Sequence, residues 1–199
     1  MSARFFAVFV TLAALLSGCK YEIYADPQLS SRDQDFLALA PQFKLDYDPF
    51  RARFRMNNNT GEPEGTIIIE SEGKFLYYVE SEKTMIRYPI SVGQDEYLWR
   101  GQATIKRKTE WPGWTPMQEA RKLNPALPLT VPGGPNNPLG SRALYLHDEN
   151  GKDTYIRIHG TNEPENIGMN VSLGCIRMHN IDVIDLYNRV PLGARVVAK

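Results

Sequence analysis

Hydrophobic and polar positions divide the chain into three parts. Residues 5–16 are almost entirely apolar and follow a single positive charge at Arg4. Residues 20–65 carry many charges and show little sustained periodicity. They predict a tether that contains one short helix around residues 33–40, which Pro41 ends. From Thr66 onward, β-branched and aromatic residues alternate with turn residues, which predicts strands.

The expected strands cover most of the C-terminal part. Three of them, at residues 66–70, 75–80 and 85–93, are separated by hairpin-length turns and predict an antiparallel meander. Further strands are expected at 103–108, 142–146, 154–158 and 194–198. Seven prolines between residues 99 and 140 favour a short helix near 116–123 followed by a long loop.

One amphipathic helix is expected near the C-terminus. Val183, Leu186, Tyr187 and Val190 follow the spacing of a helix face, with Asn180 as the expected N-cap and a proline directly after the last of them. Neither an internal repeat nor an alternating strand and helix series is present in the sequence. The pattern therefore predicts a mainly β domain, a sandwich or barrel with short helices.

Composition narrows the possible classes. The chain has 199 residues, of which 42% are hydrophobic and 23% charged, and this excludes a disordered or a polytopic membrane protein. Lys plus Arg and Asp plus Glu both number 23, so the net charge is zero. A nucleic-acid-binding protein is not expected, because it would need a basic surplus to neutralise phosphates.

The N-terminal apolar run has the form of a secretory signal peptide. It is shorter than the ~20 residues that a membrane-spanning helix needs. Leu16-Ser17-Gly18-Cys19 resembles the bacterial lipobox. This resemblance implies cleavage before Cys19 and diacylglycerol on its sulfur, and an ordinary signal peptide with an incidental cysteine is the alternative. By the sorting rule of Gram-negative bacteria, Lys20 then favours the periplasmic side of the outer membrane.

The expected organisation follows from these boundaries. Residues 1–18 form the lipoprotein signal peptide, residues 19–65 the lipidated N-terminus and tether, and residues 66–199 the folded domain. If Cys19 carries lipid, Cys175 is a lone thiol in an oxidising compartment and no internal disulfide can form. A chemical role for Cys175 would then explain why an exported protein keeps an unpaired thiol.

His159 and Cys175 form a candidate nucleophile pair. A thiol needs a nearby base or cation to become a thiolate. His159 ends an expected strand, and Cys175 comes just before the expected helix, whose amino end favours negative charge. The N–H groups of Gly174 and Cys175 could donate to an oxyanion, and Arg177 could bind a carboxylate.

The segments HGT at 159–161 and SLGCIRM at 172–178 resemble the L,D-transpeptidase catalytic domain family, the YkuD type. The PGGPNNPLGSRALYL segment at 132–146 is similar to that family as well, and the resemblance spans about residues 66–198. Leu173 departs from it, because many members have a second histidine there. The resemblance implies a YkuD-like β domain with neither a metal nor an organic cofactor.

The resemblance also implies roles at specific positions. Cys175 would be the nucleophile, His159 the general acid and base, and the carbonyl of Gly160 the group that orients the imidazole. Ser172, Gly174 and Arg177 would shape the oxyanion and substrate-carboxylate region. The thiolate would attack the third, diamino-acid residue of a peptidoglycan tetrapeptide stem, release D-Ala, and pass the acyl group to an amine of a second stem as a 3→3 cross-link. Carbapenem-type β-lactams would acylate the same sulfur.

Several alternatives remain open from the sequence. Water as acceptor would make the protein an L,D-carboxypeptidase, whereas a D-amino acid or a protein lysine would give other products. A non-catalytic peptidoglycan-binding lipoprotein could use the same groove. A metal site formed by His159, Cys175 and His179 is disfavoured, because paired ligands at helical spacing are missing. We expect a monomer whose partners are peptidoglycan stem peptides, a possible protein acceptor and, through the lipid, a membrane.

Overall fold

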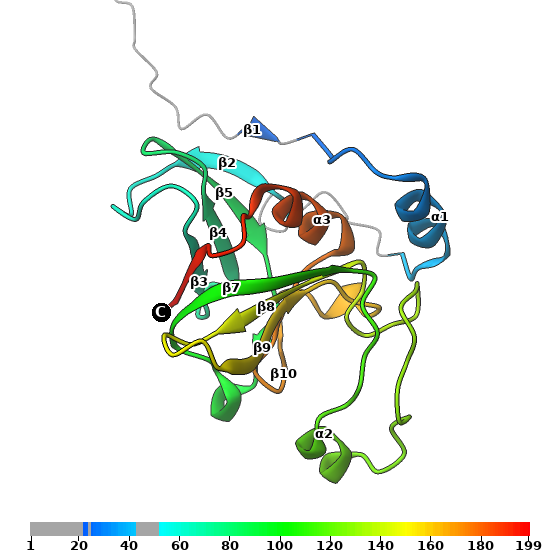
Figure 1. Ribbon diagram of the computed structural model, residues 1–199. Coiled ribbons are helices and arrows are strands. Elements are labelled where there is room, and N and C mark those ends of the chain that lie inside the picture. Colours follow the sequence, from blue (N-terminus) through cyan, green and yellow to red (C-terminus); the bar gives the residue numbers. More distant parts are fainter. Residues whose placement is uncertain (1–21, 24, 43–51) are drawn as a thin grey trace, which may run out of the picture.

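The computed structural model describes residues 22–23, 25–42 and 52–199 (Figure 1). The expected signal peptide, its cleavage site and Cys19 lie outside these residues. Within the described ranges, no helix has both the length and the apolar character needed to cross a membrane.

Ten strands form one sheet in the order β1-β2-β5-β4-β3-β12-β7-β8-β9-β11. Their bounds in chain order are β1 (Glu22–Ile23), β2 (Phe54–Asn57), β3 (Ile67–Glu70), β4 (Phe75–Val79), β5 (Thr84–Pro89), β7 (Gly101–Glu110), β8 (Arg142–His147), β9 (Asp153–His159), β11 (Ile176–Arg177) and β12 (Arg195–Ala198). A second, parallel pair consists of β6 (Val92–Gly93) and β10 (Asn170–Ser172). The C-terminal strand β12 joins the two halves of the large sheet, because it pairs parallel with β3 and antiparallel with β7.

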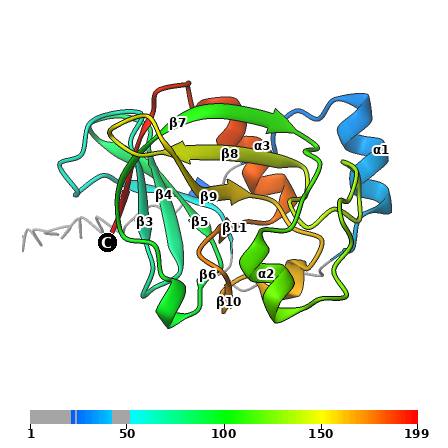
Figure 2. The same cartoon turned by 60° about the horizontal axis from the view of Figure 1, so that its bottom comes forward.

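The large sheet folds over on itself around one core. In Figure 2, β3, β4 and β5 run steeply across β7, β8 and β9. Fully buried side chains come from both halves, among them Ile69, Leu76 and Ile86 on one side and Leu144 and Ile158 on the other. Burial of such side chains stabilises each by about 1.5–3 kcal/mol. The prediction of a mainly β domain with short helices is confirmed.

All the expected strands are present, and three helices accompany them. The helices are α1 (Ser31–Leu39), α2 (Gln118–Leu123) and α3 (Asn180–Arg189), with short 3-10 turns at Asp95–Tyr97 and Pro164–Asn166. Strands β1, β2, β10 and β11 were not expected from the sequence. Each has only two to four residues, too few for a periodic pattern to be visible.

Helix α3 packs against β8 and β9 and contributes Val183, Leu186 and Val190 to the core. The expected N-cap is wrong by one residue, because His179 occupies that position and Asn180 is the first helical residue. No side chain caps this helix end. The side chain of Asn180 is instead used in long-range hydrogen bonds beside the candidate site.

Helix α1 is fastened to the domain by a buried carboxylate. Asp33 accepts hydrogen bonds from both terminal nitrogens of Arg142, each at 2.8 Å, and from the indole N–H of Trp111 at 2.9 Å. The ring of Phe36 meets Trp111 edge to face at 4.9 Å. Burial alone would raise the pKa of Asp33, but the hydrogen bonds from Arg142, Ser30 and Trp111 lower it to about 2.

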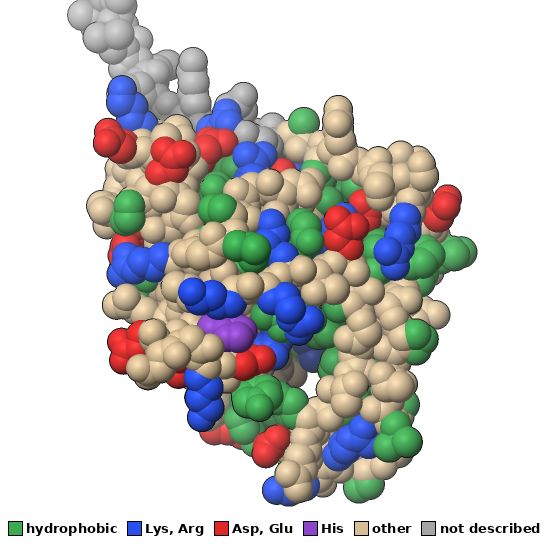
Figure 3. All heavy atoms as spheres, viewed as in Figure 1, with side chains coloured by type: hydrophobic (Ala, Val, Ile, Leu, Met, Phe, Trp, Pro, Cys, Tyr) green, Lys and Arg blue, Asp and Glu red, His purple; other side chains and the backbone are tan. Residues whose placement is uncertain are grey.

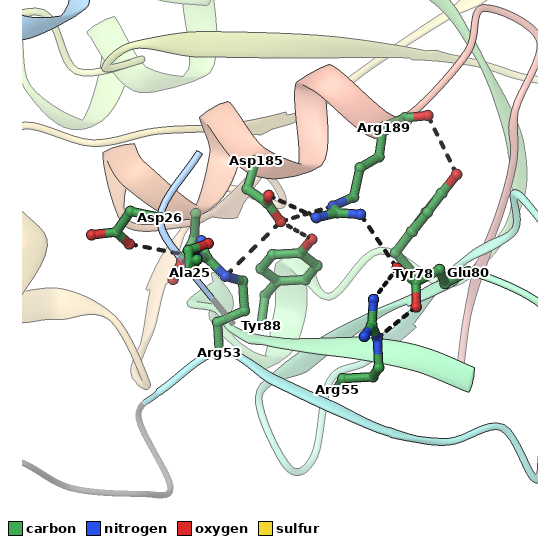
Figure 4. A network of polar contacts seen from close by, with 10 residues as sticks. Ala25, Asp26, Arg53, Arg55, Tyr78, Glu80, Tyr88, Asp185 and Arg189 are labelled. Carbon is green, nitrogen blue, oxygen red and sulfur yellow. Dashed lines mark hydrogen bonds and ion pairs between the residues drawn. The ribbon is translucent and has the colours of Figure 1, made fainter. Parts of the chain in front are cut away.

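A second polar network joins β2 and the residues around β1 to α3 (Figure 4). Arg53 is buried; it bonds to Asp182 at 3.0 Å and lies 3.9 Å from Asp185. It also donates to the carbonyl oxygen of Ala25. Tyr88 donates to Asp185 at 2.6 Å, which joins the C-terminal end of β5 to the same helix.

The described parts of residues 19–65 therefore differ from the expected tether. The expected short helix is present as α1, but it packs against the domain, and β1 and β2 extend the sheet. The physical reason is long-range pairing: Asp33 with Arg142 and Arg53 with Asp182 are more than 100 residues apart in sequence. Local periodicity carries no information about such partners.

The connection from β7 to β8 forms a lobe that carries α2. It projects from the sheet beside β9 and β10 in both ribbon views (Figures 1 and 2). Two backbone hydrogen bonds, one in each direction between Trp114 and Val131, join the two ends of the lobe. Near its end, Arg121 donates to the carbonyl oxygens of Pro128 and Leu129. The long loop expected from the prolines is thus an ordered lobe.

Candidate active site

His159 is the last residue of β9 and is buried. Its backbone pairs with Arg177 of β11 on one side and with Ala143 of β8 on the other. Its neighbour Ile158 is fully buried in the core. Because strand residues alternate between faces, the imidazole lies on the sheet face opposite the core.

The carbonyl of Gly160 orients this imidazole. Nδ1 of His159 lies 2.6 Å from the Gly160 oxygen, so Nδ1 carries the proton and donates, and Nε2 is left as the basic nitrogen. Burial, together with the nearby positive charges of Arg177 and Arg157, lowers the pKa of His159 to about 3. The imidazole is therefore neutral at pH 7, as a general base must be.

Asn180 holds the loop after His159 in place. Its side-chain oxygen accepts from the N–H of Ser141 at 3.0 Å and from that of Thr161 at 3.1 Å, and its amide donates to the Thr161 carbonyl. A Cβ on Gly160 would lie 2.2 Å from this oxygen, so only glycine fits there. The sequence analysis missed this role, since the same residue was assigned to helix capping.

Cys175 lies in the short connection between β10 and β11. It carries a free thiol and is half-buried. Its sulfur is 3.8 Å from the carbonyl oxygen of Tyr155, a residue of β9. The two-residue strand β11 lies between Cys175 and α3.

The pairing of β9 with β11 brings the two candidate residues to one face. Arg177 lies opposite His159, and Cys175 is two positions before Arg177. Side chains two apart in a strand point to the same face, and diagonal neighbours on adjacent strands are within reach of long or aromatic side chains. Among the described residues, no hydrogen bond joins the sulfur to the imidazole. Such bonds are often long or misaligned without substrate and tighten when it binds.

Ser172 organises the loop that presents the thiol. It is buried, and its hydroxyl donates to the carbonyl oxygen of Cys175 at 2.6 Å and accepts from the N–H of Gly174 at 3.1 Å. The Gly174 N–H is therefore engaged within the loop. Of the two expected oxyanion donors, the N–H of Cys175 is the remaining one.

Gly174 has a backbone conformation that other residues rarely adopt, with a φ of +110°. A Cβ at this position would lie 3.0 Å from the Ile156 side chain and 3.2 Å from the Tyr97 carbonyl oxygen. Gly93 of β6 is equally close to this loop, since its own Cβ would meet Gly174 Cα at 3.1 Å. Glycines at both positions let β6, β9 and the Cys175 loop pack closely.

Burial and two nearby arginines change the pKa of the Cys175 thiol in opposite directions. Burial raises the pKa of Cys175, whereas the backbone N–H and the positive charge of Arg157, and the charge of Arg177, lower it. Burial is the larger effect, so the thiol is protonated at neutral pH. The Cys175 thiol and the His159 imidazole are therefore both neutral at pH 7.

Arg177 is already paired. Its Nη1 donates to Glu163 at 2.9 Å, and Glu163 also accepts from Asn166. The pair is partly exposed, with side-chain exposures of 23% and 50%, so it contributes at most about 1 kcal/mol. A guanidinium has five N–H donors, so a substrate carboxylate can bind Arg177 beside Glu163 or displace it.

Arg157 was missed in the sequence analysis. It lies two residues before His159 in β9, which puts it on the same face, and strand alternation was the available signal. Asp153 holds its guanidinium with two bonds of 2.6 and 2.7 Å, and its carbon lies 4.5 Å from the ring centre of Tyr145. Arg157 is therefore a rigidly held positive charge beside Cys175.

The remaining candidates for metal or ligand binding lie elsewhere. In the part of the chain that the structure describes, no three His, Cys, Asp or Glu side chains are grouped so as to hold a metal ion. Nδ1 of His147 lies 3.0 Å from the carbonyl oxygen of Gly151 in the β8–β9 turn, and His179 is the N-cap of α3. An open cavity of about 730 Å³ between the start of β7 and the β8–β9 turn is lined by Arg100, Arg195, Asp148, Glu149 and their neighbours, with none of the candidate site residues.

Comparison with known proteins assigns the family. The model of the YkuD L,D-transpeptidase catalytic domain matches residues 64–197. "Probable L,D-transpeptidase ErfK/SrfK" of Escherichia coli K12 is 37% identical over 139 residues, which are 67% of this chain and 43% of that protein. "Putative L,D-transpeptidase YqjB" of Bacillus subtilis 168 is 32% identical over 81% of this chain and 80% of its own length. The chain spans less than half of the length of the E. coli relative.

A solved structure with similar architecture comes from Brucella melitensis. It is 47% identical and covers 74% of this chain and 92% of its own, with a TM-score of 0.52. It is described as a "Probable carnitine operon oxidoreductase caia", a name that differs from the family of the sequence relatives. The range that the family model matches includes β9 with His159 and the β10–β11 connection with Cys175. This chain belongs to the YkuD family of L,D-transpeptidase catalytic domains.

Proposed function

We propose that the protein is a cysteine-dependent L,D-transpeptidase that acts on peptidoglycan tetrapeptide stems. The observation that carries this proposal is the convergence of His159 and Cys175 on one sheet face through the β9–β11 pairing, with His159 held as a base by Gly160. Membership of the YkuD family supports the same chemistry.

The proposed reaction has two halves. Nε2 of His159 removes the proton of Cys175, and the sulfur attacks the carbonyl of the third stem residue. The N–H of Cys175 donates to the resulting oxyanion, and Arg157 and Arg177 favour negative charge at the sulfur. When the tetrahedral intermediate collapses, the imidazolium gives its proton to the amine of the departing D-Ala. A thioester remains on Cys175.

In the second half, an amine of a neighbouring stem attacks the thioester while His159 takes its proton; the C–S bond then breaks, and the imidazolium returns this proton to the sulfur. The products are an amide, which is the 3→3 cross-link, and the regenerated thiol. Ser172 acts through the loop that it holds, and Arg177 binds a carboxylate of the stem. Water in place of the amine gives a tripeptide, the carboxypeptidase outcome.

Products from defined muropeptides test this function. Incubation of the protein with purified tetrapeptide stems should release D-Ala and yield 3→3 linked dimers, measured by liquid chromatography with mass spectrometry. Tripeptides alone would instead establish a carboxypeptidase. Stems that are bound but recovered unchanged would identify a non-catalytic peptidoglycan-binding protein.

We further propose that the protein is anchored through lipid on Cys19, to the periplasmic side of the outer membrane. The support is the sequence around residues 16–19. The change Cys19→Ala should move the protein from the membrane fraction to the soluble periplasmic fraction, as seen by immunoblotting of fractionated cells. Unchanged membrane fractionation of this variant would contradict lipidation, and Cys175→Ala serves as the matched control that should leave fractionation unaltered.

A further inference from the structure

A row of side chains crosses the sheet next to Cys175. Arg107 of β7 lies opposite Tyr145 of β8, and Tyr145 lies opposite Arg157 of β9. Both guanidinium groups stack on the Tyr145 ring, at 3.4 Å for Arg107 and 4.5 Å for Arg157. Stacking of both on one ring places all three side chains on one face, the face of His159.

The row continues to the candidate nucleophile. Ile158, the residue after Arg157, pairs with Ile176, the residue after Cys175. Arg157 and Cys175 are therefore neighbours across β9 and β11. Arg107, Tyr145, Arg157 and Cys175 thus form one line across four adjacent strands, and we name the first three the Arg107 row.

The arginines near this line differ in whether a carboxylate is paired with them. Arg157 is held by Asp153, and Arg177 is held by Glu163. Arg107 is exposed, and among the described residues it has no carboxylate within ion-pair distance. Its guanidinium stacks on the buried Tyr145 ring, so Arg107 loses little side-chain entropy when it binds a ligand.

The surface around the Arg107 row fits a bound peptide. In the space-filling view, Lys and Arg side chains gather over β7, β8 and β9, above a hollow that the lobe with α2 bounds on its other side (Figure 3). Strands lie about 4.8 Å apart, so three strand spacings put Arg107 roughly 14 Å from Cys175.

We propose that Arg107 is a specificity-determining residue that binds a carboxylate of the peptide whose carbonyl Cys175 attacks. This inference rests on the proposed function and specifies its substrate class: a stem peptide that carries a free carboxylate in the part that lies along the Arg107 row. A planar guanidinium suits this group, because it can donate two parallel hydrogen bonds to it.

Binding to an inactive protein tests the proposal independently of turnover. In a Cys175→Ala background, isothermal titration calorimetry compares tetrapeptide stems that have free carboxylates with the same stems in amidated form. Arg107→Gln should weaken the affinity for the free-carboxylate stem about tenfold. Amidation also removes the carboxylate proposed for Arg177, so it should weaken the affinity of the background protein at least as much, and Arg107→Gln should then have no further effect.

Matched variants make the result specific. Lys83→Gln removes an exposed positive charge from the β4–β5 turn and should leave both affinities unchanged. Arg107→Lys keeps the charge without the paired donors and should recover part of the affinity. The amidated peptide tests carboxylate binding without changing the protein, and the loss of the Arg107→Gln effect on the amidated stem assigns part of that binding to Arg107.

The outcomes separate this inference from the proposed function. Equal binding of free and amidated stems, an equal loss in Lys83→Gln, or no binding of either stem would overturn the role of Arg107. Stems that bind in an Arg107-dependent way, but are not processed by the protein with Cys175 intact, would support the role of Arg107 and overturn the proposed reaction.

Discussion

Replacing Cys175 by alanine is expected to abolish both the release of D-Ala from tetrapeptide stems and the covalent adduct with a carbapenem. The proposed thioester forms on this sulfur, and removal of a nucleophile that works together with its base lowers turnover by at least about 10³-fold. Chromatography of the released D-Ala and intact-protein mass spectrometry measure the two effects. Undiminished turnover would remove Cys175 from the mechanism.

His159→Gln provides the matched control. The glutamine retains a polar side chain at the buried end of β9 but supplies no base, so acylation should slow by roughly 10²–10⁴-fold while the thiol stays present.

Since the pKa of His159 is lowered to about 3, the imidazole of the unmodified protein stays neutral from pH 7 down to pH 5. Acylation of the unmodified protein should therefore show no titration near pH 6.5, and a clear midpoint there would contradict the buried imidazole.

Asp33→Ala is expected to lower the free energy of unfolding by about 3–5 kcal/mol, because it leaves the charge of Arg142 buried without its partner. The side chains of the pair are only 3% and 4% exposed, so solvent screens this interaction little. The variant also removes the acceptor for the Trp111 indole N–H. Urea unfolding followed by circular dichroism measures the change.

Two controls define this effect. Asp26→Ala removes a carboxylate that also pairs with a buried arginine but is itself 76% exposed, and it should cost at most about 1 kcal/mol. The double change Asp33→Ala with Arg142→Met removes both charges and should recover part of the lost stability. A loss of less than about 1 kcal/mol in Asp33→Ala alone would show that α1 contributes little to the fold.

The ion pair of Asp33 and Arg142 makes the free energy of unfolding depend on pH. The pKa of Asp33 is lowered to about 2 in the folded protein from its ordinary value of 3.8. Its contribution to stability is therefore fully present above about pH 4 and is lost as the pH falls toward 2, where the carboxylate takes up a proton. In Asp33→Ala, the fall in stability across this range should be smaller than in the unmodified protein.

Local sequence patterns were sufficient for most of the fold. Strands of four or more residues with β-branched and aromatic positions, such as β3, β4 and β5, were expected close to their observed bounds, since alternation and turn residues are local signals. The two-residue strands β1 and β11 have no such pattern. Their existence depends on pairing with distant segments.

In the candidate site as well, some features were predicted from local sequence and others depend on contacts formed only in the folded protein. His159, Gly160, Cys175 and Arg177 were named from a short motif, and the structure gives the position of each. The engagement of the Gly174 N–H by Ser172 and the pairing of Arg177 with Glu163 were not foreseen, because both depend on how loops fold back on themselves.

By itself the sequence determined the family and the mainly β character and named the candidate nucleophile, because these follow from residue types at fixed spacing within short segments. The alignment of Arg107, Tyr145 and Arg157 with Cys175, and the fastening of α1 through Asp33, were decided only in the tertiary structure. Strand register and buried ion pairs join residues that are far apart in the chain, and no local pattern specifies them.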